Sequence, residues 1–276
     1  MDSMDKNFTD SLLNLAVDAA KEAGAVLRER FGKTHDIKFK REIDVVTESD
    51  LLAEKIIIEK IKSKFPSHSI LTEEAGSIGG SNDVCWIIDP LDGTTNFSHD
   101  FPVFSVSIGV EVEGVVTAGA VYHPMLHELF TAKKGEGAYL NGKKIKVSKI
   151  NSIGKALLST GFPYDVHYSA ENNLNYFSAF TLKAQAIRRA GSAALDLCYV
   201  ACGRFDGFWE MKLSPWDTAA GGLIVLESGG KLTDFENNSF NIREKEVLAT
   251  NGLIHNEMLE TIAKAREQCQ TPRKIS

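Results

Sequence analysis

The sequence predicts a mixed α/β fold in which helices lie on sheets, with an α+β first half and an α/β second half. Apolar side chains recur at helical spacing over residues 9–31 and about 49–65, which predicts two amphipathic helices. Short apolar runs separated by turn signals follow between residues 68 and 145, as is typical of strands. From about residue 150 strands and helices alternate, which indicates helices packed on a sheet.

We expect one domain over residues 1–276, with approximate halves at 1–148 and 149–276. A chain of 276 residues can bury a large core, as one unit or as two closely packed halves. No internal repeat, low-complexity tract or Pro/Ser-rich linker divides it. The absence of a linker favours one compact unit.

Helix boundaries in the first half are marked by the usual residues. Thr9 or Asp10 is the expected N-cap of the first helix, Gly32 follows its end, and Pro66 ends the second helix. The charged segment 34–44 between them predicts a mobile loop or a short strand. The predicted strands are 68–72, 84–89, two within 105–123 that turn near Glu113 and Gly114, 128–132, and a hairpin within 138–145 that turns at Asn141 and Gly142.

The second half reads as alternating strands and helices. The predicted elements are a strand at 156–161 followed by a helix, a helix at 191–203, a strand at 207–211 and a last strong helix at 215–228.

Composition and charge narrow the function classes. The chain is 43% hydrophobic and 25% charged, which is ordinary globular composition. The formal net charge of −6 argues against nucleic acid as the main partner, so we expect no direct nucleic-acid binding. The N-terminus lacks the apolar segment of a signal peptide, and no apolar run approaches a membrane span. We therefore expect a cytoplasmic protein without a membrane partner.

Four acids stand where ligand sites form in α/β folds. The segment WIIDPLDGTTNF (86–97) ends an apolar strand in Asp89 and Asp92, and Glu73 directly follows the strand HSILT. Strand ends host ligand sites in such folds. Asp217 falls in the first turn of the last predicted helix, where the helix dipole alone also favours an acid.

Together these acids indicate a site for a hard cation. Mg²⁺ prefers an octahedron of oxygen ligands and keeps several waters, so a few carboxylates and a carbonyl suffice. Pro90 stiffens the chain, so Asp89, Asp92 and the Leu91 carbonyl can point to one place. The chain offers no His or Cys cluster for a softer metal. Two cations about 3.5–4 Å apart suit phosphate ester hydrolysis.

Five segments resemble the inositol monophosphatase family of Mg²⁺-dependent phosphatases, in the right order over nearly the whole chain. DPLDGTTNF with a downstream WDTAAG is the most specific part. The resemblance implies a layered αβαβα sandwich of the sugar-phosphatase type, the fold shared by inositol monophosphatase and fructose-1,6-bisphosphatase. The segments are DVVTESD (44–50), LTEEAG (71–76), WIIDPLDGTTNF (86–97), RRAGSAALDLCYVACGRFDGFWEM (188–211) and SPWDTAAGGLIVLESGG (214–230).

The resemblance also implies a role for each matching position. The implied metal ligands are Glu73, Asp89, Asp92, Asp217 and the backbone carbonyl of Leu91. The implied catalytic residues are Glu73 and Thr94, which orient the attacking water, with Asp50 and Thr47 behind them. The implied substrate-binding residues are Asp92, Gly93, Thr94, Gly191, Ser192, Ala193, Glu210 and Asp217.

The implied reaction is direct in-line attack of metal-activated water on phosphorus, without a covalent phosphoenzyme. The implied cofactor is Mg²⁺, with two or three ions per site. Members of the family are commonly homodimers inhibited by lithium, so we expect a homodimer.

The substrate that matches best is myo-inositol 1-phosphate, because DGTTNF fits that branch and Glu210 could accept polyol hydroxyls. Histidinol phosphate and fructose 1,6-bisphosphate are the alternatives. A nucleotide 3′-phosphate is disfavoured, since the lysine after DGT and the longer insertions of that branch are missing. A different class is a non-catalytic regulator that binds the transcription machinery, as some bacterial members do. The presence of every implied ligand favours the enzyme.

Two other motifs suggest different chemistry, and both have simpler interpretations. Cys198 and Arg204 have the spacing of cysteine phosphatases, but Cys198 lies late in an alanine-rich helix rather than at a helix start. His123 and His127 with Glu128 could bind zinc, but Pro124 interrupts any helix that would align them. We expect a buried helix thiol and a turn between strands. The four cysteines, Cys85, Cys198, Cys202 and Cys269, are irregularly spaced and expected to be reduced.

The basic residues are expected to be mainly structural. Arg188 and Arg189 could contact phosphate, but a structural role or a subunit contact is favoured. The runs KFKR (38–41) and KKIK (143–146) are expected to be solvated faces, with a lid over the site as the alternative for the first.

Overall fold

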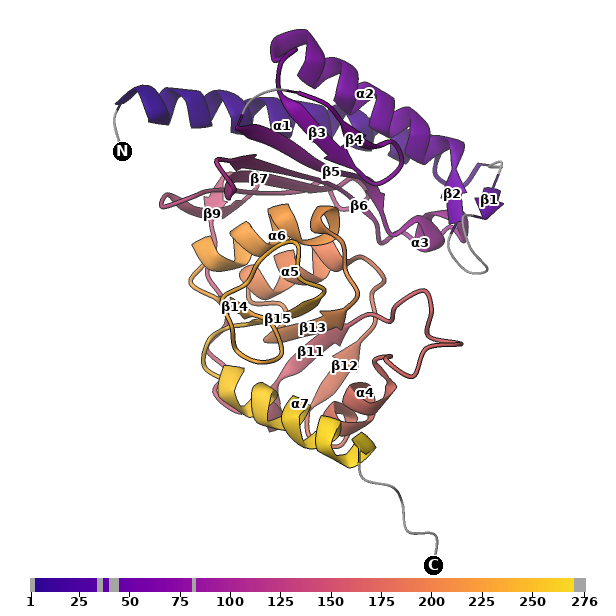
Figure 1. Cartoon of the computed structure of the whole chain (residues 1–276), viewed down its shortest axis with the longest axis vertical. Helices are drawn as coiled ribbons and strands as arrows, with labels where there is room; N and C mark the ends of the chain where they lie inside the picture. The colour runs from indigo at the N-terminus through magenta and orange to yellow at the C-terminus, as the bar shows by residue number, and fades with distance from the viewer. Residues whose placement is uncertain (1–2, 34–36, 40–44, 81–82, 271–276) are drawn as a thin grey trace, which may run out of the picture.

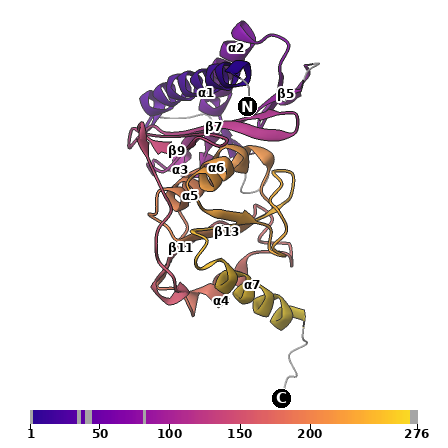
Figure 2. The ribbon, with the colours of Figure 1, turned by 90° about the vertical axis from the view of Figure 1, so that its left-hand side faces the viewer.

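Helices and sheets alternate in five layers in the computed structural model, which describes residues 3–33, 37–39, 45–80 and 83–270 (Figure 1). Helices α1 (Ser3–Arg30) and α2 (Glu48–Lys64) cover the outer face of an eight-stranded sheet. Helices α5 (Ala193–Ala201) and α6 (Pro215–Glu227) lie between this sheet and a five-stranded sheet. Helices α4 (Leu174–Thr181) and α7 (His255–Gln270) close the far face. The view turned by 90° shows the same layers (Figure 2). The predicted αβαβα sandwich is confirmed.

The eight-stranded sheet belongs to the first half of the chain. Its strands run in the order β10-β9-β8-β7-β6-β5-β3-β4, and only the β3–β5 pair is parallel. A short α3 (Thr94–Ser98) follows β5, and β1 (Ile37–Phe39) pairs with β2 (Val45–Thr47). The strands are β3 (Ser69–Thr72), β4 (Gly76–Ile78), β5 (Val84–Asp92), β6 (Ser105–Val112), β7 (Val115–His123), β8 (Glu128–Lys133), β9 (Gly137–Leu140) and β10 (Lys143–Lys144).

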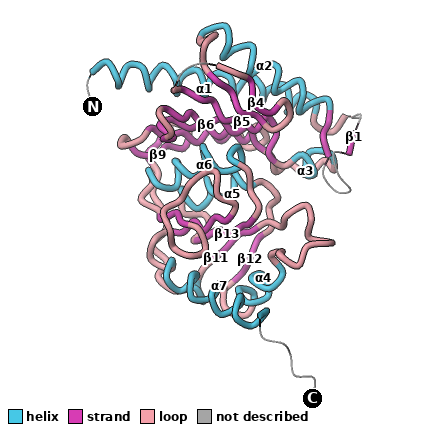
Figure 3. Tube along the Cα trace, viewed as in Figure 1, coloured by secondary structure: helices cyan, strands magenta, loops and turns pink. Residues whose placement is uncertain are grey.

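The five-stranded sheet belongs to the second half, in the order β12-β11-β13-β15-β14. Strand β11 pairs in parallel with β12 and β13, whereas β15 pairs antiparallel with β13 and β14. Figure 3 shows the two sheets as separate layers with helices between them. The strands are β11 (Leu157–Thr160), β12 (Ala186–Arg188), β13 (Gly207–Met211), β14 (Lys231–Thr233) and β15 (Glu246–Thr250), and a 3₁₀ turn at Ile153–Lys155 precedes β11.

Most predicted elements are found, with four corrections. The first helix begins at Ser3 rather than Thr9. Strand β5 continues past Asp89 to Asp92. The short strands β4 and β12 were not predicted. The helix at 215–228 is not the last element, because β14, β15 and α7 follow it. Of the segment 34–44, Ile37–Phe39 forms a strand and the rest lies outside the described residues.

Helix α6 approaches the eight-stranded sheet closely because two glycines face it. Gly109 in β6 and Gly119 in β7 are register partners. A Cβ on Gly109 would lie 2.7 Å from the Cβ of Ala219, and one on Gly119 would lie 3.0 Å from the Cα of Ala220. The missing side chains therefore form a groove for α6. This groove fixes the height of the helix above the sheet, and with it the position of its N-terminus.

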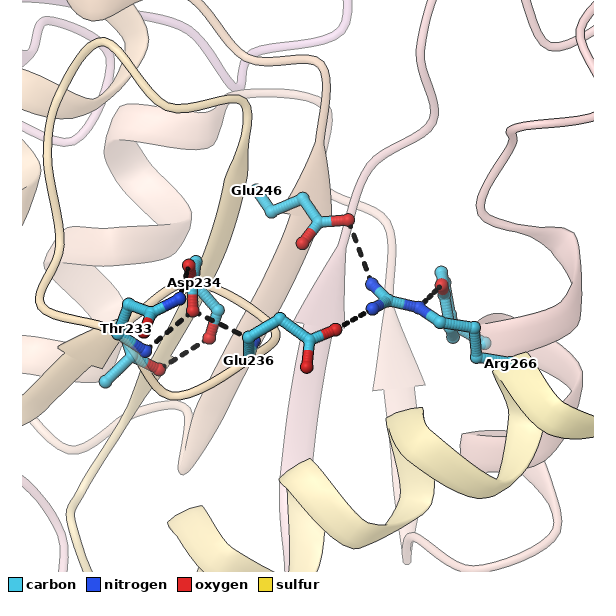
Figure 4. A network of polar contacts seen from close by, with 7 residues as sticks. Thr233, Asp234, Glu236, Glu246 and Arg266 are labelled. Atoms are coloured by element: carbon cyan, nitrogen blue, oxygen red, sulfur yellow. Dashed lines mark hydrogen bonds and ion pairs between the residues drawn. The ribbon is translucent and has the colours of Figure 1, made fainter.

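Arg266 is one of the residues that join helix α7 to the second sheet (Figure 4). Arg266 donates from Nε to the Tyr176 hydroxyl at 3.1 Å and from Nη2 to Glu246 at 3.1 Å, and it also pairs with Glu236. Met258 and other apolar side chains of α7 complete the core on that side. The helix is mostly polar in sequence, but its buried Met258, Ile262 and Ala265 recur at helical spacing and form the apolar stripe that faces the core.

None of the helices in the described part of the chain is long and apolar enough to cross a membrane.

Filling the glycine groove should destabilise the protein. In Gly109→Val the new side chain would collide with Ala219 of α6, so we expect a loss of about 1–3 kcal/mol in the free energy of unfolding. Urea unfolding measures this loss. Gly79→Ala is the control, because a Cβ at Gly79 meets nothing within 4 Å. Equal stability of the two variants would contradict the close approach of α6.

Protonation of His255 should destabilise the fold. Burial lowers the pKa of this side chain from 6.5 to about 4, with a smaller contribution from Lys231. The folded state therefore binds its proton more weakly than the unfolded state, and stability is lost as the pH falls from about 6.5 towards 4. We expect a loss of about 1–3 kcal/mol from this group. In urea unfolding at pH 7 and pH 5, His255→Gln should show a smaller pH dependence than the wild type; an identical dependence would contradict the assignment.

Candidate active site

A polar cavity of about 780 Å³ lies where the two halves of the chain meet. It is bordered by the end of β5, the start of α5, the end of β13 and the start of α6. The predicted metal-ligand and substrate-binding positions all line it: Glu73, Asp89, Leu91, Asp92, Gly93, Thr94, Gly191, Ser192, Ala193, Glu210 and Asp217.

A β-bulge brings Asp89 and Asp92 to the same cavity. The pairing of β5 with β6 shifts register between these two residues, so the strand bends across Pro90 and Leu91. Pro90 has no N–H to leave unpaired there. The Leu91 N–H donates to Asp89 Oδ1 at 3.0 Å, which fixes that carboxylate. Without the bulge, the alternation of side chains along a strand would place Asp89 and Asp92, which are three residues apart, on opposite faces of the sheet.

Asp92 is held from the second half of the chain. Its Oδ2 accepts hydrogen bonds from Ser192 Oγ at 2.5 Å and from the Ala194 N–H at 2.9 Å, at the start of α5. Burial raises its pKa to about 6, against the lowering effect of these donors. The hydrogen bonds therefore join β5 to α5 across the cavity.

Asp217 caps α6 and faces the same cavity. Its Oδ2 accepts the Ser214 N–H at 2.6 Å, in a capping box that starts the helix. Burial raises its pKa well above the usual value, and the carboxylates of Asp92, Glu73 and Glu210 raise it further. Asp217 therefore has the structural role expected of an acid in the first turn of a helix, and it also lines the cavity.

Thr94 contacts Asp50 behind the cavity wall. Thr94 Oγ1 lies 2.9 Å from Asp50 Oδ1 and 3.0 Å from the Leu91 carbonyl oxygen. Asp50 Oδ2 accepts from the N–H of Thr47 at 2.8 Å and from its hydroxyl at 2.6 Å, in the capping box of α2. Asp50 and Thr47 are buried and are not among the residues that line the cavity. They support Thr94 from behind.

Glu210, in β13, lines the cavity, and its carboxyl group lies against Gly161. A Cβ on Gly161 would lie 2.1 Å from Glu210 Oε1, so only glycine leaves room for the carboxyl group. Burial raises the pKa of Glu210 to about 8; Arg189 lowers it and Asp92 raises it. Glu210 is therefore largely a neutral carboxylic acid at pH 7, able to donate as well as accept a hydrogen bond.

The donor set of the cavity fits a hard cation. Burial raises the pKa of Asp89 well above its usual value, and Glu73, Asp92 and Asp217 raise it further. Such carboxylates either bind a proton or are stabilised as anions by a cation between them. Within the described residues no group of three or more His, Cys, Asp or Glu side chains is gathered closely enough to hold a metal ion by itself, so water and carbonyl oxygens would have to complete the ligand set. This open arrangement suits Mg²⁺, which keeps several waters and also takes carbonyl ligands.

The cavity also contains residues without a predicted site role, and two of them carry charge near the candidate ligands. Arg189, for which a structural role or a subunit contact was favoured over a phosphate contact, lines the cavity near Glu210. Asp196 lines it from α5, one helical turn after Ser192. Asp196 Oδ1 is buried and has no hydrogen-bond partner among the described residues. The spacing of four between Ser192 and Asp196 was the available signal in the sequence.

The two competing motifs have the structural explanations that were expected. Cys198 is fully buried within α5, and burial raises the pKa of its thiol well above the usual value, so a thiolate is disfavoured. His123 ends β7, a turn follows, and Glu128 begins β8. Cys85, Cys198 and Cys202 are free thiols, and the side chain of Cys269 lies outside the described residues.

The basic runs differ in what the structure describes. Lys143, Lys144 and Lys146 are exposed, as expected for a solvated face. Of the run 38–41, Lys38 and Phe39 lie in β1, whereas Lys40 and Arg41 lie outside the described residues, so the lid stays a hypothesis.

Comparison with known proteins identifies the family. The model of the inositol monophosphatase family matches residues 9–271. An inositol-1-monophosphatase of Synechocystis is 47% identical, over 91% of this chain and 88% of that protein. The Nus factor SuhB of Haemophilus influenzae is 43% identical, over 91% of this chain and 95% of that protein. The solved inositol monophosphatase of Anabaena has a TM-score of 0.84 at 42% identity, with 92% of this chain and 96% of that chain covered.

The fold and its likeness to solved structures define a layered αβαβα protein of the sugar-phosphatase type. The chain belongs to the inositol monophosphatase family. It is accordingly an enzyme of the phosphoric monoester hydrolase class.

Removing one buried carboxylate should relieve repulsion in the metal-free protein. Asp89→Asn keeps the shape of the side chain but removes a charge that burial and three neighbouring acids disfavour. We expect the metal-free variant to melt at or above the wild-type temperature in EDTA, while the wild type gains more from added Mg²⁺. Thermal unfolding with and without Mg²⁺ measures both effects. A large loss of stability in EDTA would contradict the repulsion.

Proposed function

We propose that this enzyme is a Mg²⁺-dependent phosphatase that hydrolyses a sugar or polyol phosphate monoester, with myo-inositol 1-phosphate as the preferred substrate. The observation that carries the proposal is the convergence of Glu73, Asp89, Asp92 and Asp217 on one cavity that also contains Glu210. The name of the Synechocystis relative supports the choice of substrate.

In this proposal the chain binds Mg²⁺ through four carboxylates and one carbonyl. The metal ligands are Glu73, Asp89, Asp92, Asp217 and the Leu91 carbonyl, with two or three ions per site. Mg²⁺ would supply Lewis-acid activation of water and would stabilise charge on the leaving oxygen. The ligands come from both halves of the chain, so we also propose that residues 1–276 act as one catalytic domain.

Thr94 would orient the attacking water. A hydroxyl has one proton, so Thr94 Oγ1 can donate either to Asp50 or to the Leu91 carbonyl, which lie at similar distances. When the Leu91 carbonyl serves as a metal ligand, donation to Asp50 is favoured. The lone pairs of Thr94 Oγ1 then face the water, and Glu73 can accept its proton. Thr47 holds Asp50 in place for this task.

The phosphate and the polyol would occupy opposite parts of the cavity. The backbone amides of Gly93 and Thr94 would bind the phosphate, since N–H groups after a bend are anion binders. Gly191, Ser192 and Ala193, at the start of α5, would contact the substrate with Glu210. Glu210 can accept a hydrogen bond from one polyol hydroxyl, and in the neutral form that burial favours it can also donate to a second polyol oxygen. This pairing favours a substrate with neighbouring hydroxyl groups.

The wider setting of the enzyme is also a proposal. We infer a cytoplasmic homodimer whose main partner is the phosphate ester rather than nucleic acid. Tyr168, which precedes α4, Leu174, which begins it, and Leu182, which follows it, are 71%, 54% and 85% exposed, and we propose that they contribute to the subunit contact.

A second function is supported by one comparison. Relatives 42–43% identical to this chain bear the name Nus factor SuhB, so a role with the transcription machinery is the alternative proposal. A pull-down with the wild type and with Asp89→Asn tests it. A transcription protein retained by both forms would support a separate binding role, and its absence from both would count against that role.

Phosphate release from a set of esters tests the proposed function. The esters are inositol 1-phosphate, histidinol phosphate and fructose 1,6-bisphosphate, each with Mg²⁺ and with EDTA, and kcat/KM ranks them. Asp89→Asn and Asp217→Asn should each lose at least about 100-fold in kcat, since even residues that only support a metal site cost 10–100-fold. Cys198→Ser is the control and should stay active.

The activity measurements can contradict the proposed metal site, the proposed chemistry or the preferred substrate. Full activity of Asp217→Asn at saturating Mg²⁺ would exclude the proposed metal site. An inactive Cys198→Ser would instead point to cysteine chemistry. A higher kcat/KM for fructose 1,6-bisphosphate or histidinol phosphate would overturn the preferred substrate, and lithium-insensitive turnover would weaken kinship with the inositol branch.

A further inference from the structure

The turn that carries Glu73 is short and lies at the edge of the cavity. Thr72 and Gly76 are register partners in the β3–β4 hairpin, so residues 73–75 alone make the turn. The Glu73 N–H donates to the Ile88 carbonyl of β5 at 3.3 Å. Since Glu73 lines the cavity, the direction of its side chain depends on what holds this turn.

A buried carboxylate of α2 holds the turn from behind. Glu54 Oε1 accepts three hydrogen bonds: from the Thr72 hydroxyl at 2.6 Å, from the Glu74 N–H at 3.1 Å and from the Ala75 N–H at 3.1 Å. The donors flank Glu73 on both sides in the sequence. Glu54 is only 5% exposed and does not line the cavity. Loss of this acceptor would leave three donors to find other partners.

The same face of α2 also holds Thr94. Asp50 precedes Glu54 by four residues, so the two carboxylates lie one helical turn apart on one face. Asp50 accepts from Thr94 Oγ1, and Glu54 accepts from the turn around Glu73.

We propose that Glu54 is a positioning residue for Glu73, and that Asp50 and Glu54 together make α2 the element that sets the separation of Glu73 and Thr94. The inference rests on the proposed function, in which these two residues orient the attacking water. A single rigid helix that holds both residues would keep this separation constant while substrate enters and product leaves. Glu54 would act only through Glu73, because it does not touch the cavity.

Three variants on α2 test the proposal. Glu54→Ala removes the acceptor, Glu54→Gln keeps an oxygen that can accept all three hydrogen bonds, and Glu59→Ala removes an exposed acid of the same helix as the matched control. Calorimetric titration with Mg²⁺ gives the metal affinity without reference to activity, and phosphate release gives kcat. We expect Glu54→Ala to bind Mg²⁺ about 10-fold or more weakly and to lose kcat, as for other residues that support a metal site.

Glu54→Gln and Thr72→Val test whether the hydrogen bonds accepted by Glu54 are the cause of the effect. Glu54→Gln should restore Mg²⁺ affinity to near that of Glu59→Ala; if it stays as weak as Glu54→Ala, the hydrogen-bond account is wrong. Wild-type Mg²⁺ affinity and kcat in Glu54→Ala would overturn the proposal. Should Glu54→Ala fail to fold, Thr72→Val removes one of the three donors at constant shape and should show a smaller shift in the same direction; wild-type values there would overturn the proposal.

Glu73→Gln tests the proposed metal site independently of the role of Glu54. Glu73→Gln should weaken Mg²⁺ binding directly. Unchanged Mg²⁺ affinity in Glu73→Gln would contradict the proposed metal site, whatever Glu54→Ala does. Weakened binding in Glu73→Gln together with wild-type binding in Glu54→Ala would leave the metal site standing and remove only the role of Glu54.

Discussion

Repulsion between buried carboxylates is the constraint on which the rest of the structure depends. Asp89 is disfavoured as an anion first by burial and then by Glu73, Asp92 and Asp217, and Asp217 is disfavoured in the same way. A chain does not gather acids in this manner for stability, because each buried charge carries a desolvation cost. The arrangement becomes favourable when a cation joins it, which is the proposed working state of the enzyme.

The fold holds these acids in place with rigid elements and fixed donors. Helix α6 lies in the groove of Gly109 and Gly119 and presents Asp217 at its first turn. The start of α5 holds Asp92 through Ser192 and a backbone N–H. Each of these hydrogen bonds fixes the direction of a carboxylate that lines the cavity. Partners that orient the ligands in this way support the affinity of a metal site.

Patterns in the sequence indicated the acids, together with Asp50 and Thr47 behind Thr94, but not the support of Glu73 by Glu54. Asp89, Asp92 and Asp217 were found because each stands at the end of a strand or the start of a helix within a specific motif. Glu54 gives no local signal, since its partners lie 18 to 21 residues further along the chain and meet it only in the folded protein. The bulge in β5 and the place of Arg189 in the cavity are likewise set by tertiary contacts.

The layered architecture was predictable because helices with an apolar face, such as α1, are encoded by spacing. The same spacing is present in α7, where Met258, Ile262 and Ala265 are buried, so this helix was a signal in the sequence that was missed. The short strands β4 and β12, each of three residues, carry too little periodicity to be predicted in this way.

The central claim is that a cation neutralises acids supplied by both halves of the chain. A crystal structure of the protein grown with Mn²⁺ in place of Mg²⁺ tests this most directly, because anomalous scattering locates the metal. The account predicts anomalous peaks among Glu73, Asp89, Asp92 and Asp217, with the Leu91 carbonyl oxygen directed at one of them. Metal bound elsewhere, or a cavity without an anomalous peak at saturating Mn²⁺, would contradict it.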